Sequence, residues 1–160
     1  MASNRHLGRI LVLQSLYEFD FRKDCGDTTS VLSEIVDRNI VRYSKSIDDK
    51  AFIVALANDV SKNHDDLDSV LQPIAPDWPI DQIARMDRLV LHISAYELLS
   101  NSDVPPKVVI NEAVELSKAF GGENSSKFIN GVLGTLLRSK EEGKLKLPET
   151  LRFDKKVEKK

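Results

Sequence analysis

The sequence predicts an all-α protein of about seven helices arranged in two packed helical subdomains. Apolar residues recur at three- and four-residue spacing through most of the 160 residues, which is the period of amphipathic helices. Glycine and proline are scarce, with 7 and 6 copies, and most of them fall between the periodic segments. No run of alternating apolar and polar residues calls for a sheet.

The first helix is expected from about Asn4 to Phe21. One predicted face carries Leu7, Ile10, Gln14, Tyr17 and Phe21, and on another face Arg5 and Arg9 sit one turn apart. The polar segment RKDCGDTTS then ends the helix.

Three shorter helices follow. The second is expected from a cap at Thr29 or Ser30 to about Tyr43, the third from a cap at Asp48, and the fourth from about Asp65 to Ile74. The segment PIAPDWP then interrupts the pattern, since each proline disfavours helix at the residue before it. We interpret it as the joint between subdomains of about residues 1–76 and 80–138. Trp78 is predicted to wedge between them, with a base-stacking platform as the alternative.

The second subdomain begins with a long helix after Pro79, with a short first turn set off at Arg85. Pro106 suits the first turn of the next helix, and Gly121-Gly122 ends it. Asn124 or Ser125 starts the last helix. This helix is expected to run through Asn130-Gly131, with Gly131 at a close helix contact.

Composition narrows the class of protein. The net charge of −2 excludes a generally basic nucleic-acid coat, although residues 1–17 hold Arg5, His6 and Arg9 and no acid. No apolar run is long enough to span a membrane, and the amino end lacks the features of a secretory signal. The single Cys25 permits no disulfide framework within one chain, so a cytoplasmic protein is expected.

No catalytic or metal-binding constellation emerges. His6, His64 and His92 have no cysteine or histidine at zinc-ligand spacing, and His92 is interpreted as a structural histidine. Cys25 has no base near it in sequence, and no glycine-rich loop follows a strand. We therefore predict a non-enzymatic protein without cofactor, metal or membrane.

Two clusters are candidates for RNA binding. On the first helix, Arg5, His6 and Arg9 would meet phosphates, Gln14 a base edge and Tyr17 a base face. Around the Gly-Gly turn, the candidates are Lys118, Phe120, Asn124, Ser125, Lys127 and Phe128. Two other interpretations remain open. In the first, the arginines lie on a solvated helix start without binding RNA. In the second, the aromatic rings, which have core-like spacing, are buried in the core.

Three strings carry a family resemblance: LQSLYEFDF, DRLVLHISAYELL and DVPPKVVINEAVELSKAFGGENSSKFINGVL. In this order and spacing they resemble the NusB family over about residues 5–138. The resemblance implies a single NusB-like helical domain over residues 1–138 and no catalysis. Residues 139–160 lie outside it and are expected to form a charged, flexible tail.

The resemblance also implies partners. NusB proteins bind the boxA element of nascent ribosomal RNA together with NusE, a small-subunit ribosomal protein, and contact elongating RNA polymerase with other Nus factors to suppress termination. By position, the family's RNA contacts fall on the ten residues Arg5, His6, Arg9, Gln14, Tyr17, Phe120, Asn124, Ser125, Lys127 and Phe128. Asp87 is the best single candidate for a contact to the basic partner NusE.

The amino end departs from the family pattern, because it holds two arginines where relatives often have three or four. Fewer phosphate contacts imply weaker binding by RNA contact alone and a heavier reliance on NusE. Two alternatives are a domain detached from a ribosomal RNA cytosine methyltransferase and a helical interaction module without RNA binding. The chain contains no cofactor-binding βαβ unit and ends in KKVEKK, so we favour the complete factor over the first alternative.

Overall fold

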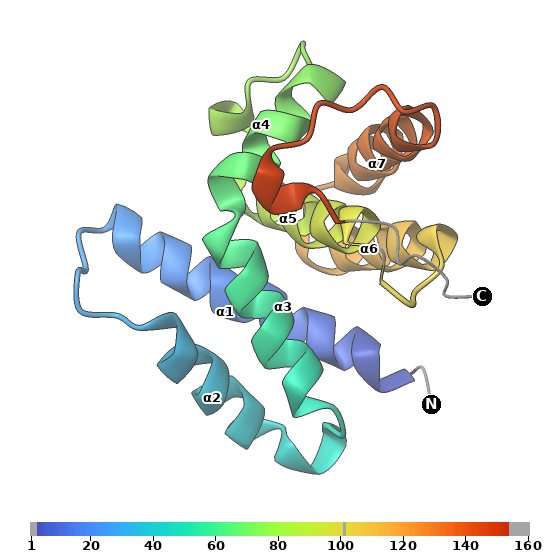
Figure 1. The fold of residues 1–160 in the computed structure, drawn as a ribbon. Helices are drawn as coiled ribbons and strands as arrows, with labels where there is room; N and C mark the ends of the chain where they lie inside the picture. Colours follow the sequence, from blue (N-terminus) through green and yellow to red (C-terminus); the bar gives the residue numbers. More distant parts are fainter. Residues whose placement is uncertain (1–2, 101, 154–160) are drawn as a thin grey trace. The chain divides into compact units, whose positions relative to one another are not determined.

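The computed structural model describes residues 3–100 and 102–153, which contain seven α-helices, three short 3-10 turns and no strand. The prediction of an all-α fold of about seven helices is confirmed (Figure 1). The chain divides into two compact units, Met1–Lys62 and Asn63–Lys160. Each unit has its own set of packed helices, and we describe them in turn.

The first unit is a three-helix bundle of α1 (Ser3–Asp24), α2 (Leu32–Arg42) and α3 (Lys50–Lys62), with a 3-10 turn at Ser44–Ser46. Each of its helices packs on the other two (Figure 1). The buried residues of α1 include Leu11, Val12, Leu13 and Leu16. The face through Leu7, Ile10, Gln14, Tyr17 and Phe21 is not the buried one, because Gln14 and Phe21 are exposed.

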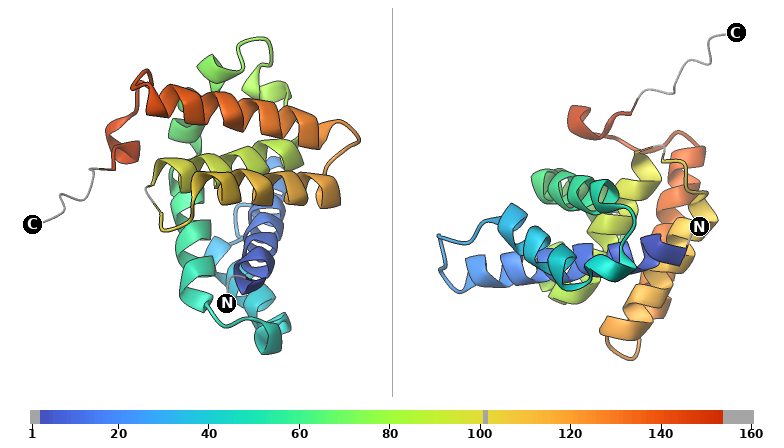
Figure 2. Two further views of the ribbon diagram at one scale, coloured as in Figure 1. Left: turned by 90° about the vertical axis from the view of Figure 1, so that its right-hand side faces the viewer. Right: turned by 90° about the horizontal axis from the view of Figure 1, so that it is seen from below.

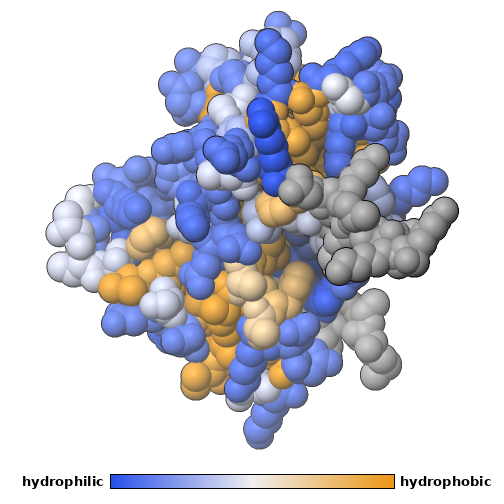
Figure 3. Space-filling model, in the orientation of Figure 1, coloured by the Kyte–Doolittle hydropathy of each residue, from blue (hydrophilic) through white to orange (hydrophobic). Residues whose placement is uncertain are grey.

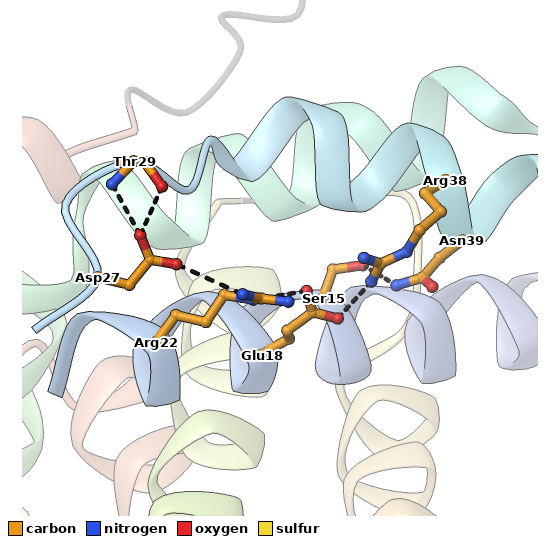
Figure 4. Close-up of polar contacts among 7 residues, drawn as sticks. All are labelled: Ser15, Glu18, Arg22, Asp27, Thr29, Arg38 and Asn39. Carbon is orange, nitrogen blue, oxygen red and sulfur yellow. Dashed lines mark hydrogen bonds and ion pairs between the residues drawn. The ribbon is translucent and has the colours of Figure 1, made fainter. Parts of the chain in front are cut away.

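A polar network fastens α1 to α2 (Figure 4). Glu18 accepts hydrogen bonds from Arg38 of α2 and from Arg22 Nε at 3.0 Å. The bond from Arg38 is the main cause that holds the pKa of Glu18 below its ordinary value, against the opposing effect of burial. Beneath it, buried Asn39 donates a hydrogen bond to Ser15 Oγ at 3.0 Å. The arginines of this network are therefore engaged with carboxylates.

The helix starts of the first unit differ slightly from prediction. The helix α3 is capped by Asp49, whose Oδ1 accepts the Phe52 N–H at 3.0 Å, and not by Asp48. The helix α2 begins after Val31, with no side-chain cap at this residue. Apolar side chains come to the surface over this unit (Figure 3). Val41 of α2 is 72% exposed.

The second unit contains α4 (His64–Ile74), α5 (Arg85–Leu99), α6 (Pro106–Phe120) and α7 (Ser125–Glu141), with 3-10 turns η2 (Ile80–Gln82) and η3 (Glu149–Leu151). The helices α5, α6 and α7 pack on one another and run side by side (Figure 2). Their buried residues include Leu91, Ile93, Leu116, Ile129 and Leu133. This packing sets the Gly-Gly turn at one end of the α6–α7 pair.

The division of the chain differs from the predicted boundary at residues 76–80. The helix α4 packs against α5 and α7, so it belongs to the second unit and the boundary falls between Lys62 and Asn63. The PIAPDWP segment is thus a loop within the second unit. Prolines break a helix equally well inside a compact unit, so the prolines of this segment do not mark a boundary between units.

The segment after the family-like region is also ordered where it is described, which corrects the prediction of a flexible tail over residues 139–160. The helix α7 extends to Glu141, and Leu151 of η3 is fully buried and contacts the α4 side of the unit. The Phe153 ring packs edge-on against Tyr96, with ring centroids 5.8 Å apart. Residues 154–160 of the predicted tail lie outside the described residues.

The last helix confirms one prediction about Asn130-Gly131 and contradicts another. Both residues lie inside α7, as expected. A Cβ added at Gly131 would meet no atom within 4 Å, so this glycine is not at a close helix contact. The same is true of Gly134. A helical glycine without a packing role lowers helix stability by about 1 kcal/mol.

Candidate nucleic-acid interface

The predicted site residues on α1 belong to the first unit. The Arg5 side chain is 38% exposed, lies 4.8 Å from the centre of the Phe52 ring and is 4.0 Å from Asp49 Oδ2. His6 is half-buried beside it. A guanidinium over an aromatic face keeps its charge and its outward N–H groups, so Arg5 is held in place yet accessible to an anion.

Arg9 differs from this expectation. It is 3% exposed, and its guanidinium lies 5.3 Å from the centre of the same Phe52 ring. A phosphate would reach Arg9 only after its surroundings moved. The arrangement of α1 and α3 therefore makes Arg9 chiefly a packing residue, which leaves Arg5 and His6 as the accessible basic groups among the three predicted.

Further along α1, Gln14 is exposed and Tyr17 is half-buried. The Tyr17 ring stacks on Phe21, which is 49% exposed, with a centroid distance of 6.4 Å and an interplanar angle of 7°. The core reading of Tyr17 does not hold, since the ring belongs to a partly exposed aromatic pair. Phe21 is a neighbour of Tyr17 that is not among the predicted RNA contacts.

The second cluster is built on the Gly121-Gly122 turn. Ser125 Oγ accepts the Gly122 N–H at 2.8 Å and is buried, so this serine shapes the turn. A Cβ at Gly121 would lie 2.6 Å from Ser125 Oγ and 2.7 Å from the Ser117 carbonyl oxygen. No side chain fits there, and the tight turn fixes the start of α7.

Around this turn the other predicted residues are accessible. Asn124 and Lys127 are exposed, Phe120 is 37% exposed and Phe128 is half-buried. Neither aromatic ring is in the core. A cation, an amide and two accessible rings thus lie at one end of the α6–α7 pair, the combination that single-stranded RNA sites use.

Trp78 also belongs to this cluster, although it is not among the predicted RNA contacts. It is 59% exposed, and its ring meets Phe128 edge to face at a centroid distance of 5.8 Å and an interplanar angle of 66°. The predicted wedge between subdomains is wrong, because the loop that carries Trp78 lies within the second unit. The signal was present in PIAPDWP, where a large aromatic follows a short, polar, proline-bounded turn.

Two open hollows flank the Trp78–Phe128 pair. The Gly131 hollow, of about 300 Å³, is lined by residues that include Asp77, Trp78, Lys127, Phe128, Gly131 and Thr135. The Asp87 hollow, of about 380 Å³, is lined by residues that include Trp78, Gln82, Asp87, Asn124, Ser125 and Phe128. The structure therefore brings the predicted partner contact Asp87 together with the predicted RNA contacts at the start of α7.

Asp87 carries an unusual feature for a surface carboxylate. Its Oδ1 is buried and has no hydrogen-bond partner within the described part of the chain. A buried acceptor without a partner is rare, because it forfeits its hydrogen bonds to water. Asp87 also lines the Asp87 hollow, so its carboxylate places a negative charge there that suits a cationic group of a bound molecule.

The structure provides no catalytic or metal site in the residues it describes. No three histidine, cysteine or acidic residues among them come together as ligands, and Cys25 is exposed. His92 is 3% exposed and bonds through Nε2 to Asp68 Oδ1 at 2.5 Å, which supports the structural interpretation. Across residues 3–100 and 102–153, no helix combines the length and apolarity needed to cross a bilayer.

Comparison with known proteins decides the family. The model of the NusB family matches residues 6–138. The chain belongs to the NusB family. The transcription antitermination protein NusB of Dehalococcoides mccartyi (strain CBDB1) is 37% identical over 139 residues, which cover 87% of this chain and 93% of that protein. The prediction of a non-enzymatic protein agrees with a family whose relatives are named for antitermination.

Solved NusB structures have the same fold. The structure of T. maritima NusB matches with a TM-score of 0.76 and 29% identity, covering 91% of this chain and 100% of that one. A crystal structure of the antitermination factors NusB and NusE in complex with double-stranded RNA matches with a TM-score of 0.74, covering 87% of this chain and 99% of the matched chain. At 21% identity, the second likeness concerns the fold alone.

Proposed function

We propose that this chain is an RNA-binding transcription antitermination factor. It binds boxA RNA of nascent ribosomal transcripts together with NusE and, in the cytoplasm with other Nus factors, helps RNA polymerase resist termination. The observation that carries the proposal is the cluster at the start of α7, where Lys127, Asn124 and accessible aromatic rings surround two hollows. The relatives named as antitermination proteins and the solved NusB–NusE–RNA complex support it.

The chemistry of the cluster suits a single RNA strand. Lys127 provides a point charge for a phosphate, and Asn124 offers both a donor and an acceptor to a base edge. Phe120 and Phe128 supply apolar ring surface against which a base stacks. On α1, Arg5 and His6 would add phosphate contacts and Gln14 and Tyr17 base contacts.

Asp87 is the proposed contact to NusE. Asp87 lines the Asp87 hollow, so its carboxylate would form a charge-assisted bond with a lysine or arginine of a basic partner that enters the hollow. Such a charge-assisted bond would stabilise the protein complex. The burial of Arg9 reduces the cations available to RNA alone and so favours an RNA interface shared with NusE.

A helical interaction module that binds NusE without RNA is the second candidate, and the same burial of Arg9 favours it. The two candidates differ in RNA affinity. Labelled boxA and scrambled RNA should be titrated with the full chain, with and without NusE, across a salt series. We expect boxA to bind more tightly than scrambled RNA and to gain affinity when NusE is present.

Equal affinities for boxA and scrambled RNA under all conditions would contradict specific recognition. The absence of a complex with NusE would contradict the partner assignment. Arg5→Ala and Lys127→Ala should each lower the slope of log affinity against log salt by about 0.7, the value for one phosphate contact on a single strand. Lys45→Ala, at an exposed position in the first unit, is the matched control and should leave the slope unchanged.

A further inference from the structure

Trp78 is the only tryptophan of the chain and is more than half exposed. Exposure of a large apolar ring to water is energetically unfavourable. Tryptophan is also a frequent contact residue in binding sites, so an exposed tryptophan indicates a binding surface. Its edge-to-face contact with Phe128 leaves most of the Trp78 ring surface accessible. Trp78 lines both hollows, so it stands as a ridge between them.

The loop that carries Trp78 is held in one conformation by Gln72. The Gln72 amide donates hydrogen bonds to the carbonyl oxygens of Trp78 at 3.1 Å and Ala75 at 3.3 Å. Its Oε1 accepts the Ile80 N–H at 2.9 Å. The Trp78 N–H in turn bonds to the Ala75 carbonyl oxygen at 3.1 Å. An exposed ring on a fixed loop is preorganised, which lowers the entropy lost on binding.

The Gly131 hollow beside this ring is open where a side chain would normally stand. A Cβ at Gly131 would meet nothing within 4 Å, although α7 would be more stable with alanine there. Gly134 has equally free space but is not among the residues that line either hollow. Gly131 therefore leaves the hollow open at the side of α7, although a glycine lowers the stability of the helix.

We propose that the Gly131 hollow binds one unpaired nucleobase of single-stranded RNA, which stacks on the Trp78 ring. The inference rests on the proposed RNA-binding function and extends it to a site beyond the ten predicted RNA contacts. Lys127, which lines the hollow, meets the phosphate of the same nucleotide. Thr135 Oγ1, also on its wall, donates its hydrogen to the Gly131 carbonyl oxygen at 3.0 Å and accepts from Arg138 at 3.2 Å, which leaves one lone pair to accept a base N–H.

Charge and size favour a base over other occupants. The Asp77 carboxylate lines the hollow and repels a phosphate inside it, whereas it accepts hydrogen bonds from base N–H groups. A volume of about 300 Å³ is at the lower end of small-molecule sites. It suits a single planar base better than a helix or strand of a protein partner. Lys127 and Phe128 also make the hollow continuous with the candidate RNA cluster.

The first test removes the ring. Trp78→Ala is expected to lower the affinity for boxA RNA by about 5- to 100-fold, the range for loss of one base–aromatic stack, and Trp78→Phe by less. Tyr43→Ala is the matched control, because Tyr43 is an exposed aromatic residue that lines neither hollow. Thermal unfolding of each variant, followed by circular dichroism, checks that the fold is retained.

The second test fills the hollow without touching the ring. Gly131→Leu should reduce RNA affinity, whereas Gly134→Leu, on the same helix with equally free space, should not. RNA strands with one abasic position each then locate the base. At one position, the abasic strand should bind the wild type less tightly than the intact strand does, whereas the two strands should bind Trp78→Ala with equal affinity. The same abasic strand should no longer quench the fluorescence of the single tryptophan.

Each outcome decides between the explanations. If the wild type binds no RNA with or without NusE, the proposed function fails and the inference fails with it. If the wild type binds boxA while Trp78→Ala and Gly131→Leu bind equally well, only the inference is overturned. If these variants lose affinity for NusE alone and keep their RNA affinity, the hollow is a protein-docking site and the base assignment is wrong.

Discussion

Replacing Leu151 by alanine is expected to lower the free energy of unfolding of the second unit by about 2–5 kcal/mol. The side chain is fully buried, although it follows a charged segment and lies outside the region matched by the family model. Its removal deletes apolar contacts and leaves a cavity at η3, which packs on α4. Thermal or denaturant unfolding followed by circular dichroism measures the effect.

The loss should appear as a fall in Tm on the order of 10 °C for a chain of this length. Lys146→Ala is the matched control, since Lys146 is exposed in the same segment and should change stability by less than about 0.5 kcal/mol. Equal stability of Leu151→Ala and Lys146→Ala would contradict the packed arrangement of residues 142–153.

Replacing Asp68 by alanine is expected to destabilise the second unit by about 3 kcal/mol, because a buried polar network loses its shared acceptor. Asp68 of α4 accepts hydrogen bonds from Arg88 Nη2 at 2.7 Å and from His92 Nε2 at 2.5 Å, both on α5. Without the carboxylate, buried His92 has no partner at Nε2, and its Nδ1 already has none in the described residues. Urea unfolding at neutral pH measures the loss.

The same carboxylate predicts a pH dependence. Partial burial alone would raise the pKa of Asp68, but the hydrogen bonds from His92 and Arg88 together outweigh it and hold the pKa below its ordinary value. Its stabilising effect is therefore complete above the unfolded-state pKa of about 4 and is lost as the pH falls through the lower folded-state pKa. Asp68→Asn should remove this part of the acid dependence, whereas Asp37→Ala, at an exposed position on α2, should retain it.

The helices of the second unit could be predicted from the sequence because their ends carry strong local signals. Pro106 and the Gly-Gly pair place α6 where the structure has it, and the short turn before Arg85 is also found. The buried face of α1 could not be predicted, because the apolar residues Ile10–Leu13 are consecutive and point in every direction, so periodicity fails to select a side. The buried Leu151 was missed since its contacts join segments far apart in sequence.

The candidate site was predictable only in part. The residues around the Gly-Gly turn were predicted from the helix start and from the NusB resemblance, and they lie together, but local sequence could not show that the Ser125 hydroxyl bonds within the turn. The burial of Arg9 depends on Phe52, which comes from another helix. The exposure of Trp78 depends on a loop that Gln72 holds through hydrogen bonds, and no periodicity reports such a contact.

The central proposal is that the surface formed by Trp78, Asp87 and the start of α7 binds both RNA and the partner protein NusE. Amide chemical-shift mapping of the ¹⁵N-labelled chain with boxA RNA and NusE tests it directly. We expect the largest chemical-shift changes over Gly121–Phe128, at Asp87 and at the indole N–H of the single tryptophan. Changes confined to α2 and the polar network at Glu18, with an unmoved indole signal, would contradict it.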